Sequence, residues 1–540
     1  MSPIRFATKT APLAARSSYL SAAHHVGLRA RRQPRLHPLM RDAGFISATS
    51  VILIVANPLI IALFARLLGA AALGEYLLTR RLANWGNALS QLGMGVALPR
   101  YVARAPYDHT ADSETYFAVA LISGGLFAGL IGLVLVVFRP LAAQQLFGSY
   151  ALSRLVPPLA LLLLGLIAQS MVYGYYQGRL RMGWASALQI CNLAVVPLLA
   201  VVALHGFQSV GMIVSVIALA MLSSSAWLAR PALAGLRTTS LVAMRTHAAE
   251  LLRFGIPRIP GDFALNALIA AGPVVAVHLV PMSQVSYLLV GISMVTVIEA
   301  TASPISVIAL SKASQMIAEN RQDEITQAVT HLLNGIVGAS LFACFQLEVF
   351  ADVLIRVWVG HEFSASTATI RILLLAIPFD MVYVSMRSFI EASTITAFNV
   401  RNVLLCLVLF VSGLAVLLAF PPSKGMLNYI AAAYALSFVL LAALTIRCVR
   451  KLFDVTPQWR EVAWPCLAAI VLGVGTAAIR WYTEFGSNLS TAIALEVGAL
   501  AGYAYILKML GSPWLDFGLS LIRHSAAAVR HGSDSGDGQR

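Results

Sequence analysis

Hydrophobic residues run along this chain in long blocks, and short polar connections separate the blocks. A helix needs about 20 mostly apolar residues to cross a bilayer. Segments of that length predict an all-α, polytopic membrane protein with about 14 transmembrane helices. The predicted spans are 44–65, 75–98, 115–138, 154–178, 183–204, 208–229, 258–280, 285–311, 325–346, 366–391, 398–419, 426–447, 462–479 and 489–508.

The second span carries a row of polar residues. Arg80, Asn84, Asn87 and Gln91 recur at steps of four, three and four, which places them on one face of a helix. An unpaired polar group in hydrocarbon costs several kcal/mol, so this face cannot lie against lipid. We predict that it lines a hydrated path for a large, polar, anionic substrate. Arg81 lies about 100° around the helix from Arg80, so we expect one of the two arginines to leave this wall for the headgroups or an acidic partner.

The second half of the chain repeats features of the first at an almost constant offset, which suggests an internal duplication of six spans each. An even number of spans gives both halves the same orientation, so the pseudo-symmetry axis should follow the membrane normal. The prediction is two six-helix pseudo-symmetric lobes around a central cavity, plus two C-terminal helices. The echoes pair Asn84, Asn87 and Gln91 with Thr296, Glu299 and Ser303 at 212 positions, Gly148 with Gly360 at 212, and Tyr76 with Tyr287 at 211.

These features divide the chain into six predicted parts. Residues 1–43 form a basic cytoplasmic tail, 44–229 the N-lobe and 230–257 an amphipathic cytoplasmic linker. Residues 258–447 form the C-lobe, 448–510 the last two spans, and 511–540 a cytoplasmic tail. The basic composition at the N-terminus is similar to that of an organelle transit peptide, but a plain basic tail, or translation from Met40, is the interpretation we favour.

Composition agrees with a membrane protein, because hydrophobic residues make up 59% of the chain and charged residues 11%. The net charge of +15 comes from basic residues scattered between spans, with no basic groove that would bind nucleic acid. Lys and Arg gather in the loops of one side, which places both termini in the cytoplasm. The five cysteines fall within spans or at their inner ends, so we expect neither a disulfide nor a metal site.

Ionisable residues inside spans are costly and are candidates for function. The alternative for each is an ion pair that only holds helices together. Asn57 and Pro58 interrupt the first span, either as a kink or as part of a cavity wall, and Tyr173 is a weaker cavity candidate. Beside the polar row and Arg81, the predicted cavity residues are Arg258, Asn266 and Arg387; the predicted ion-coupling or salt-bridge residues are Glu299, Asp262, Asp380, Glu391 and Glu496.

Four stretches of the chain show a family resemblance: FARLLGAAALGEYLL, LGMGVALPRYVA, LLRFGIPRIPGDF and WVGHEFSASTATIRILLLAIPF. They resemble bacterial polysaccharide flippases of the multidrug, oligosaccharidyl-lipid and polysaccharide exporter superfamily. The resemblance covers about residues 44 to 510. A signature of the lipid II flippase branch, in which Arg-Asp follows the first span, is replaced here by alanines after Gly69, which favours exopolysaccharide or O-antigen units as substrate.

The resemblance implies two lobes in a V shape that work by alternating access. It implies no enzyme activity, and movement of an undecaprenyl-diphosphate-linked oligosaccharide from the inner to the outer leaflet of the bacterial cytoplasmic membrane. Implied partners are this lipid-linked oligosaccharide, membrane lipids, a polymerase and other polysaccharide-assembly proteins. We expect no cofactor, since the chain has no Walker A motif; coupling to H⁺, to Na⁺ or to the membrane potential stays open.

Two other functions compete with the flippase. A drug or organic-cation antiporter of the same superfamily would place acids rather than arginines in its cavity and usually has twelve spans. A membrane glycosyltransferase, polymerase or ligase would usually need a large outer loop, whereas the longest outer loop predicted here covers about 347–366.

Overall fold

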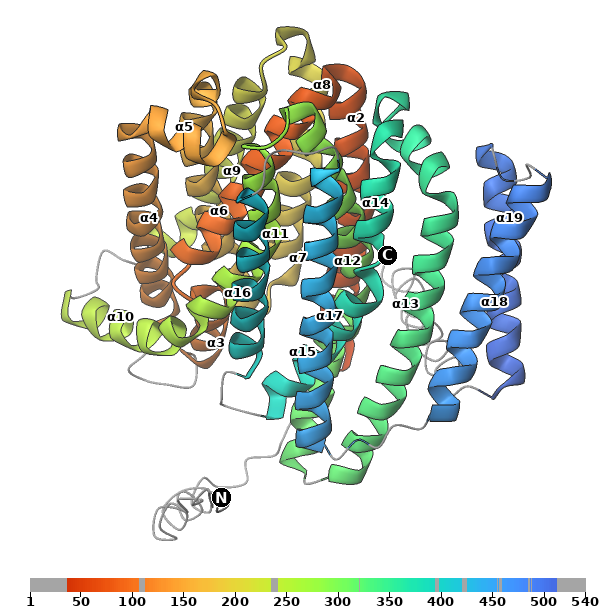
Figure 1. Ribbon diagram of the computed structural model, residues 1–540. Coiled ribbons are helices and arrows are strands. Elements are labelled where there is room, and N and C mark those ends of the chain that lie inside the picture. The colour runs from red at the N-terminus through yellow and green to blue at the C-terminus, as the bar shows by residue number, and fades with distance from the viewer. Residues whose placement is uncertain are drawn as a thin grey trace, which may run out of the picture.

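The computed structural model describes residues 36–511, apart from 106–111, 235–240, 320, 394–397, 420–424, 454, 456–458, 484–485 and 487. Most of the two predicted tails therefore lies outside the described residues. Throughout the described ranges the regular secondary structure is helical, as predicted (Figure 1). The main helices are α2 (Leu36–Ser90), α3 (Met94–Arg104), α4 (Ser113–Val137), α5 (Arg139–Phe147), α6 (Val156–Gly178), α7 (Met182–Ile190), α8 (Val196–Leu204), α9 (Val210–Ala234), α10 (Leu241–Gly255), α11 (Ile259–Ala276), α12 (Met282–Ala318), α13 (Gln322–Trp358), α14 (Thr367–Leu374), α15 (Ile377–Ser393), α16 (Phe398–Leu418), α17 (Met426–Phe453), α18 (Trp459–Thr483) and α19 (Leu489–Met509).

The described part of the chain contains 12 helices long and apolar enough to cross a membrane, or 13 if α14 and α15, bent by 45° at their junction, form one span. The protein is thus a multi-pass membrane protein, but the predicted number of fourteen is not confirmed. The difference arises largely at α2, which is counted as one span although it includes the first predicted span, 44–65, and most of the second, 75–98.

The chain reverses its direction within α2. Gly69 has a φ of 82° and a ψ of 176°, and these backbone angles are not helical. The Phe64 and Tyr76 rings stack with centroids 3.8 Å apart, whereas twelve residues of straight helix would separate them by about 18 Å. Glycine reaches this backbone conformation without strain. The reversal lays the two halves of α2 side by side.

The second predicted span ends earlier than its hydrophobic pattern suggested. Helix α2 stops at Ser90, Leu92 and Gly93 both have positive φ, and α3 starts at Met94. A Cβ on Gly93 would lie 2.2 Å from the Gly255 carbonyl oxygen, so the backbones of the two glycines meet here. Gln91 closes the last turn of the helix, since its backbone N–H donates to the Asn87 carbonyl oxygen at 2.9 Å, and the helical face of Arg80 ends there.

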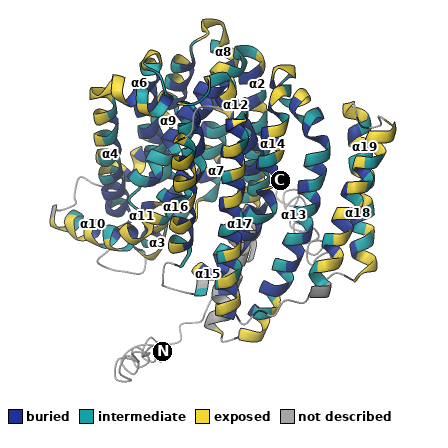
Figure 2. Cartoon of the chain, in the orientation of Figure 1, coloured by how far each residue is buried: buried dark blue, intermediate teal, exposed yellow. Residues whose placement is uncertain are grey.

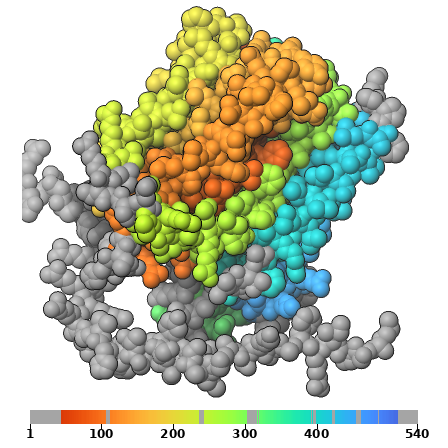
Figure 3. Space-filling model, turned by 90° about the vertical axis from the view of Figure 1, so that its left-hand side faces the viewer, coloured from red at the N-terminus to blue at the C-terminus, as the bar shows by residue number. Residues whose placement is uncertain are grey.

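The remaining helices pack in two groups that meet along α2. Helices α3, α4, α6 and α9 gather on one side of α2, and α11, α12, α15, α16 and α17 on the other. Within the predicted linker, α10 packs against α3 and α4 (Figure 3). Helices α18 and α19 pack mainly against α13 and expose apolar residues such as Trp464, Val471 and Val497 (Figure 2), as expected of lipid-facing helices. The residue limits of the two predicted lobes stay a prediction.

Candidate functional site

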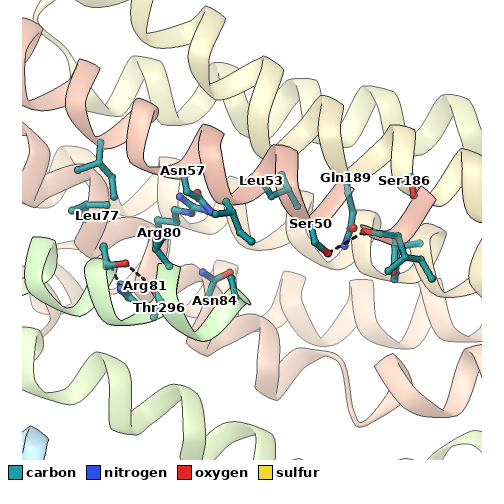
Figure 4. A pocket seen from close by; sticks show the side chains of 17 residues that line it. Ser50, Leu53, Asn57, Leu77, Arg80, Arg81, Asn84, Ser186, Gln189 and Thr296 are labelled. Atoms are coloured by element: carbon teal, nitrogen blue, oxygen red, sulfur yellow. Dashed lines mark hydrogen bonds between the residues drawn. The ribbon is translucent and has the colours of Figure 1, made fainter. Parts of the chain in front are cut away.

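A cavity of about 450 Å³ lies where the two helix groups meet. Both halves of α2 form its walls, together with α6, α7 and α12 (Figure 4). The reversal at Gly69 creates this site, since it sets residues of the first half of α2, such as Asn57, opposite Arg80 of the second half. Two arginines and no acid occur among the seventeen described residues that line it.

Arg80 and Arg81 both line the cavity. Arg81 also has the acidic partner expected for one of the two arginines, because it interacts electrostatically with Glu299 of α12. In Figure 4 the Arg80 side chain lies beside Asn57, whereas Arg81 faces α12. Arg81 Nη2 donates a hydrogen bond to Ser293 Oγ at 3.3 Å, and Arg80 is within hydrogen-bonding reach of the Tyr76 hydroxyl. Both arginine side chains are only partly buried.

The predicted polar row divides into two parts. Asn84 lines the cavity with the arginines, but Asn87 and Gln91 are not among its lining residues. Gln91 Nε2 donates to Ser170 Oγ of α6 at 3.2 Å, so this amide joins two helices. The Asn87 Oδ1 atom is buried and has no hydrogen-bond partner among the described residues. Gln91 therefore belongs to a contact between two helices, and Asn87 lies outside the cavity wall.

Several polar lining residues were left undecided or missed by sequence reasoning. Asn57, whose role was open, faces the cavity, and Tyr173 does so too. Ser50 of α2 also lines it, as do Ser186 and Gln189 of α7. The sequence of α7 has no polar periodicity strong enough to single out the last two. Their contribution depends on the tertiary contact of α7 with α2, which no local pattern encodes.

A buried charge cluster adjoins the cavity without lining it. Glu299 of α12 interacts electrostatically with Arg387 and with Arg81. Asp380 of α15 is only 4% exposed and interacts with Glu299 and Arg387. Arg387 thus faces acids rather than the cavity, where it was predicted. Through Arg81, the positive cavity wall contacts this acidic group.

The other predicted site residues lie away from the cavity. Arg258 places its guanidinium 3.8 Å from the centre of the Phe254 ring, and Asn266 Nδ2 donates to the Asp262 carbonyl oxygen at 2.9 Å. Both Arg258 and Asp262 are exposed. These residues lie at or next to the start of α11, whereas the cavity is lined by residues of α2, α6, α7 and α12.

Two further predicted acids are equally remote. Glu391 is exposed, and its Oε1 accepts a hydrogen bond from Asn399 Nδ2 at 3.1 Å. Glu496 lies on α19, which packs against α13 and α18, and its buried Oε2 has no hydrogen-bond partner within the described ranges. Neither acid contributes to the cavity wall.

One end of the helix bundle is closed by contacts between the two groups. At the end that carries Gly69, His278 Nε2 donates to the Gln145 carbonyl oxygen at 3.1 Å, and Arg66 Nη2 donates to the Val357 carbonyl oxygen. A Cβ on Gly148 would come within 2.3 Å of the Val277 carbonyl oxygen. The backbones of Gly148 and Val277 are therefore in direct contact at this end of the bundle.

Comparison with known proteins agrees with this architecture. A family model described as "Polysaccharide biosynthesis protein" matches residues 39–311. The chain is 24% identical over 489 residues to Stage V sporulation protein B of Bacillus subtilis (strain 168), which covers 83% of this chain and 90% of that protein.

Solved structures share the fold at low sequence identity. The lipid II flippase MurJ in an inward closed conformation superimposes with a TM-score of 0.70 at 12% identity, over 87% of this chain and 98% of MurJ. An inward-facing multidrug resistance transporter of the MATE family and the MOP superfamily gives a TM-score of 0.55 at 13% identity, over 75% of this chain and 94% of that one.

The predicted resemblance to flippases of this superfamily is confirmed by these matches. The chain shares the fold of these two membrane transporters. The matched family model spans half of its length. The chain belongs to the polysaccharide biosynthesis protein family.

Proposed function

We propose that this protein moves undecaprenyl-diphosphate-linked oligosaccharide repeat units from the inner to the outer leaflet of the bacterial cytoplasmic membrane, for exopolysaccharide or O-antigen synthesis. Alternating access between an N-lobe, 44–229, and a C-lobe, 258–447, exposes the cavity to each side in turn. Both termini lie in the cytoplasm, so the end that carries Gly69 faces outward.

One observation carries this proposal: the cavity has two arginines, several amides and hydroxyls, and no acid among its described lining residues. A diphosphate carries about two negative charges, and arginine binds phosphate oxygens through charge-assisted hydrogen bonds. Sugar hydroxyls lose water on entering a membrane, at a cost of a few kcal/mol each without replacement hydrogen bonds. Amide and hydroxyl walls supply such replacements.

The membrane potential favours this direction of transport. Moving one charge across 100 mV is worth about 2.3 kcal/mol, so two negative charges leaving an inside-negative compartment gain about 4.6 kcal/mol. Coupling to H⁺ or Na⁺ through Glu299, which contacts the cavity arginine Arg81 electrostatically, adds to this driving force in our proposal. The cavity charge argues against the cation antiporter, because two arginines repel a cationic drug.

Deletion of the gene followed by lipid analysis tests the proposal. We expect lipid-linked repeat units to accumulate in the inner leaflet, where reagents confined to the outside cannot reach them. Repeat units displayed on the outer leaflet but left unpolymerised would point to a polymerase instead. Unchanged lipids together with increased sensitivity to cationic drugs would favour the antiporter.

A further inference from the structure

The polar groups of the cavity are not mixed evenly but are sorted by charge. Figure 4 shows Arg80 and Arg81 at one end, near Asn57 and Thr296. The opposite end contains Ser50, Ser186 and Gln189. One end therefore suits an anion, and the other suits an uncharged ligand with several hydrogen-bonding groups.

The distance between the two ends fits a diphosphate joined to a sugar. Ser50 and Asn57 lie on the same straight part of α2, seven residues apart, which corresponds to about 10 Å along the helix. Pockets that enclose a small ligand measure about 300–1,000 Å³. A cavity of about 450 Å³ therefore holds the diphosphate and the sugar next to it, while the rest of a repeat unit extends beyond.

The chemistry of the far end restricts the sugar. Ser186 is 6% exposed, and Ser50 and Gln189 are partly buried. These side chains offer hydroxyl and amide groups, which donate and accept hydrogen bonds but do not neutralise a charge. An ammonium or a carboxylate on the sugar would be buried beside them without a counter-ion, at high cost.

We propose that Ser50, Ser186 and Gln189 form a sugar-recognition subsite, which selects an uncharged sugar, directly attached to the diphosphate, by hydrogen bonds to its hydroxyl or acetamido groups. The inference rests on the proposed function and deepens it. In the proposed topology this subsite lies on the cytoplasmic side of the arginines, so the sugar enters the cavity below its diphosphate.

A pair of defined lipids tests the subsite in proteoliposomes. The probes are undecaprenyl diphosphate bearing glucose and the same lipid bearing N-acetylglucosamine, which differ only in the group at one sugar carbon. The quantity measured is the ratio of their transport rates. Loss of one hydrogen bond in a site built around the sugar changes such a ratio by about tenfold. We expect that change in Gln189→Leu and in Ser186→Ala.

Ser293→Ala is the matched control, because Ser293 lines the arginine end of the same cavity. It should slow both lipids alike and leave the ratio unchanged. A ratio that stays constant in Gln189→Leu and in Ser186→Ala, while both lipids still move, would overturn the subsite and spare the transport function. If the wild-type protein moves neither lipid, the proposed function itself fails. Binding of both lipids to detergent-purified Ser186→Ala gives a second measurement should Gln189→Leu fold poorly.

Discussion

Arg81 donates a hydrogen bond to Ser293, and the two residues are 212 positions apart. This is the offset at which the second half of the sequence echoes the first. Two equivalent positions of a repeat touch each other only near the axis that relates the copies. The contact between α2 and α12 therefore lies close to the pseudo-symmetry axis, and the cavity opens beside it.

The same offset relates the two contacts that close the Gly69 end. Adding 212 to Gln145 gives Val357, and subtracting 212 from His278 gives Arg66, so the His278–Gln145 and Arg66–Val357 hydrogen bonds are equivalent in the two halves. In each, a side chain of one half binds a backbone carbonyl of the other. The closed end is thus held by a pair of symmetry-related contacts.

Removing both contacts should open this end. We expect the double variant Arg66→Ala, His278→Ala to increase labelling of a cysteine introduced at Asn84 by an impermeant reagent added outside. The expected increase is about thirtyfold, since each hydrogen bond contributes about 1 kcal/mol and the two together about 2 kcal/mol. Arg139→Ala is the control, because Arg139 Nε donates to the Ser153 carbonyl oxygen within one half. Equal labelling in the control and the double variant would contradict the assignment.

The break between α2 and α3 should depend on Gly93. A Cβ there would lie 2.2 Å from the Gly255 carbonyl oxygen, and the φ of 72° is strained for alanine. Gly93→Ala should lower stability by about 2 kcal/mol or more, measured as a lower melting temperature in detergent. Gly125→Ala on α4 has open space around the added methyl group and should change little. Equal melting temperatures for the two variants would be incompatible with this account.

Attachment of α18 to α13 should depend on Arg480. Its Nη2 lies 2.6 Å from Asp352 Oδ2, and its side chain is 18% exposed. Arg480→Ala leaves a half-buried carboxylate without its best partner, so we expect a loss of about 1–3 kcal/mol in unfolding free energy. Arg356 approaches the same oxygen at 3.3 Å but is 44% exposed, and Arg356→Ala should cost less than about 1 kcal/mol. The reverse order of the two effects would show that α18 is held in another way.

A variant of Glu299 distinguishes coupling to an ion gradient from the effect of the membrane potential on the charged substrate. In Glu299→Gln the side chain keeps its size but cannot bind a proton or balance Na⁺. We expect transport in proteoliposomes to lose any stimulation by a proton or sodium gradient, and to keep its response to an imposed potential. A variant that still responds to the same ion gradient as the wild-type protein would exclude Glu299 from coupling.

Much of the fold could be predicted from periodicity, and the site only in part. Hydrophobic blocks reveal spans because a membrane helix must be apolar along its length. The position of Arg80 followed from the same logic, since an arginine in a span needs a polar surrounding. The reversal between the first two spans was predicted, although not that Gly69 makes it between two helices that follow each other directly. The break at Gly93 and the polar side chains of α7 were not predicted, because each depends on contacts between distant segments.

Arg80 and Arg81 show what a helical wheel could predict about the site. The wheel separates the two residues by about 100°, and in the structure Arg80 lies beside Asn57 whereas Arg81 faces α12. Both still line the cavity, because α12 forms part of its wall together with α2. Gln91 lies outside the cavity, and its side-chain amide donates instead to Ser170 of α6.

Transport of an undecaprenyl-diphosphate-linked oligosaccharide between the leaflets of a proteoliposome tests the central claim most directly. The expected result is movement that accelerates when the side the lipid leaves is made negative. Arg80→Ala should reduce this movement by about ten- to a hundredfold, since a charge-assisted hydrogen bond contributes about 1.5–3 kcal/mol, and Arg80→Lys should keep part of it. Full activity of Arg80→Ala at normal protein levels, or movement that the opposite potential accelerates, would contradict a positively lined cavity that carries the diphosphate.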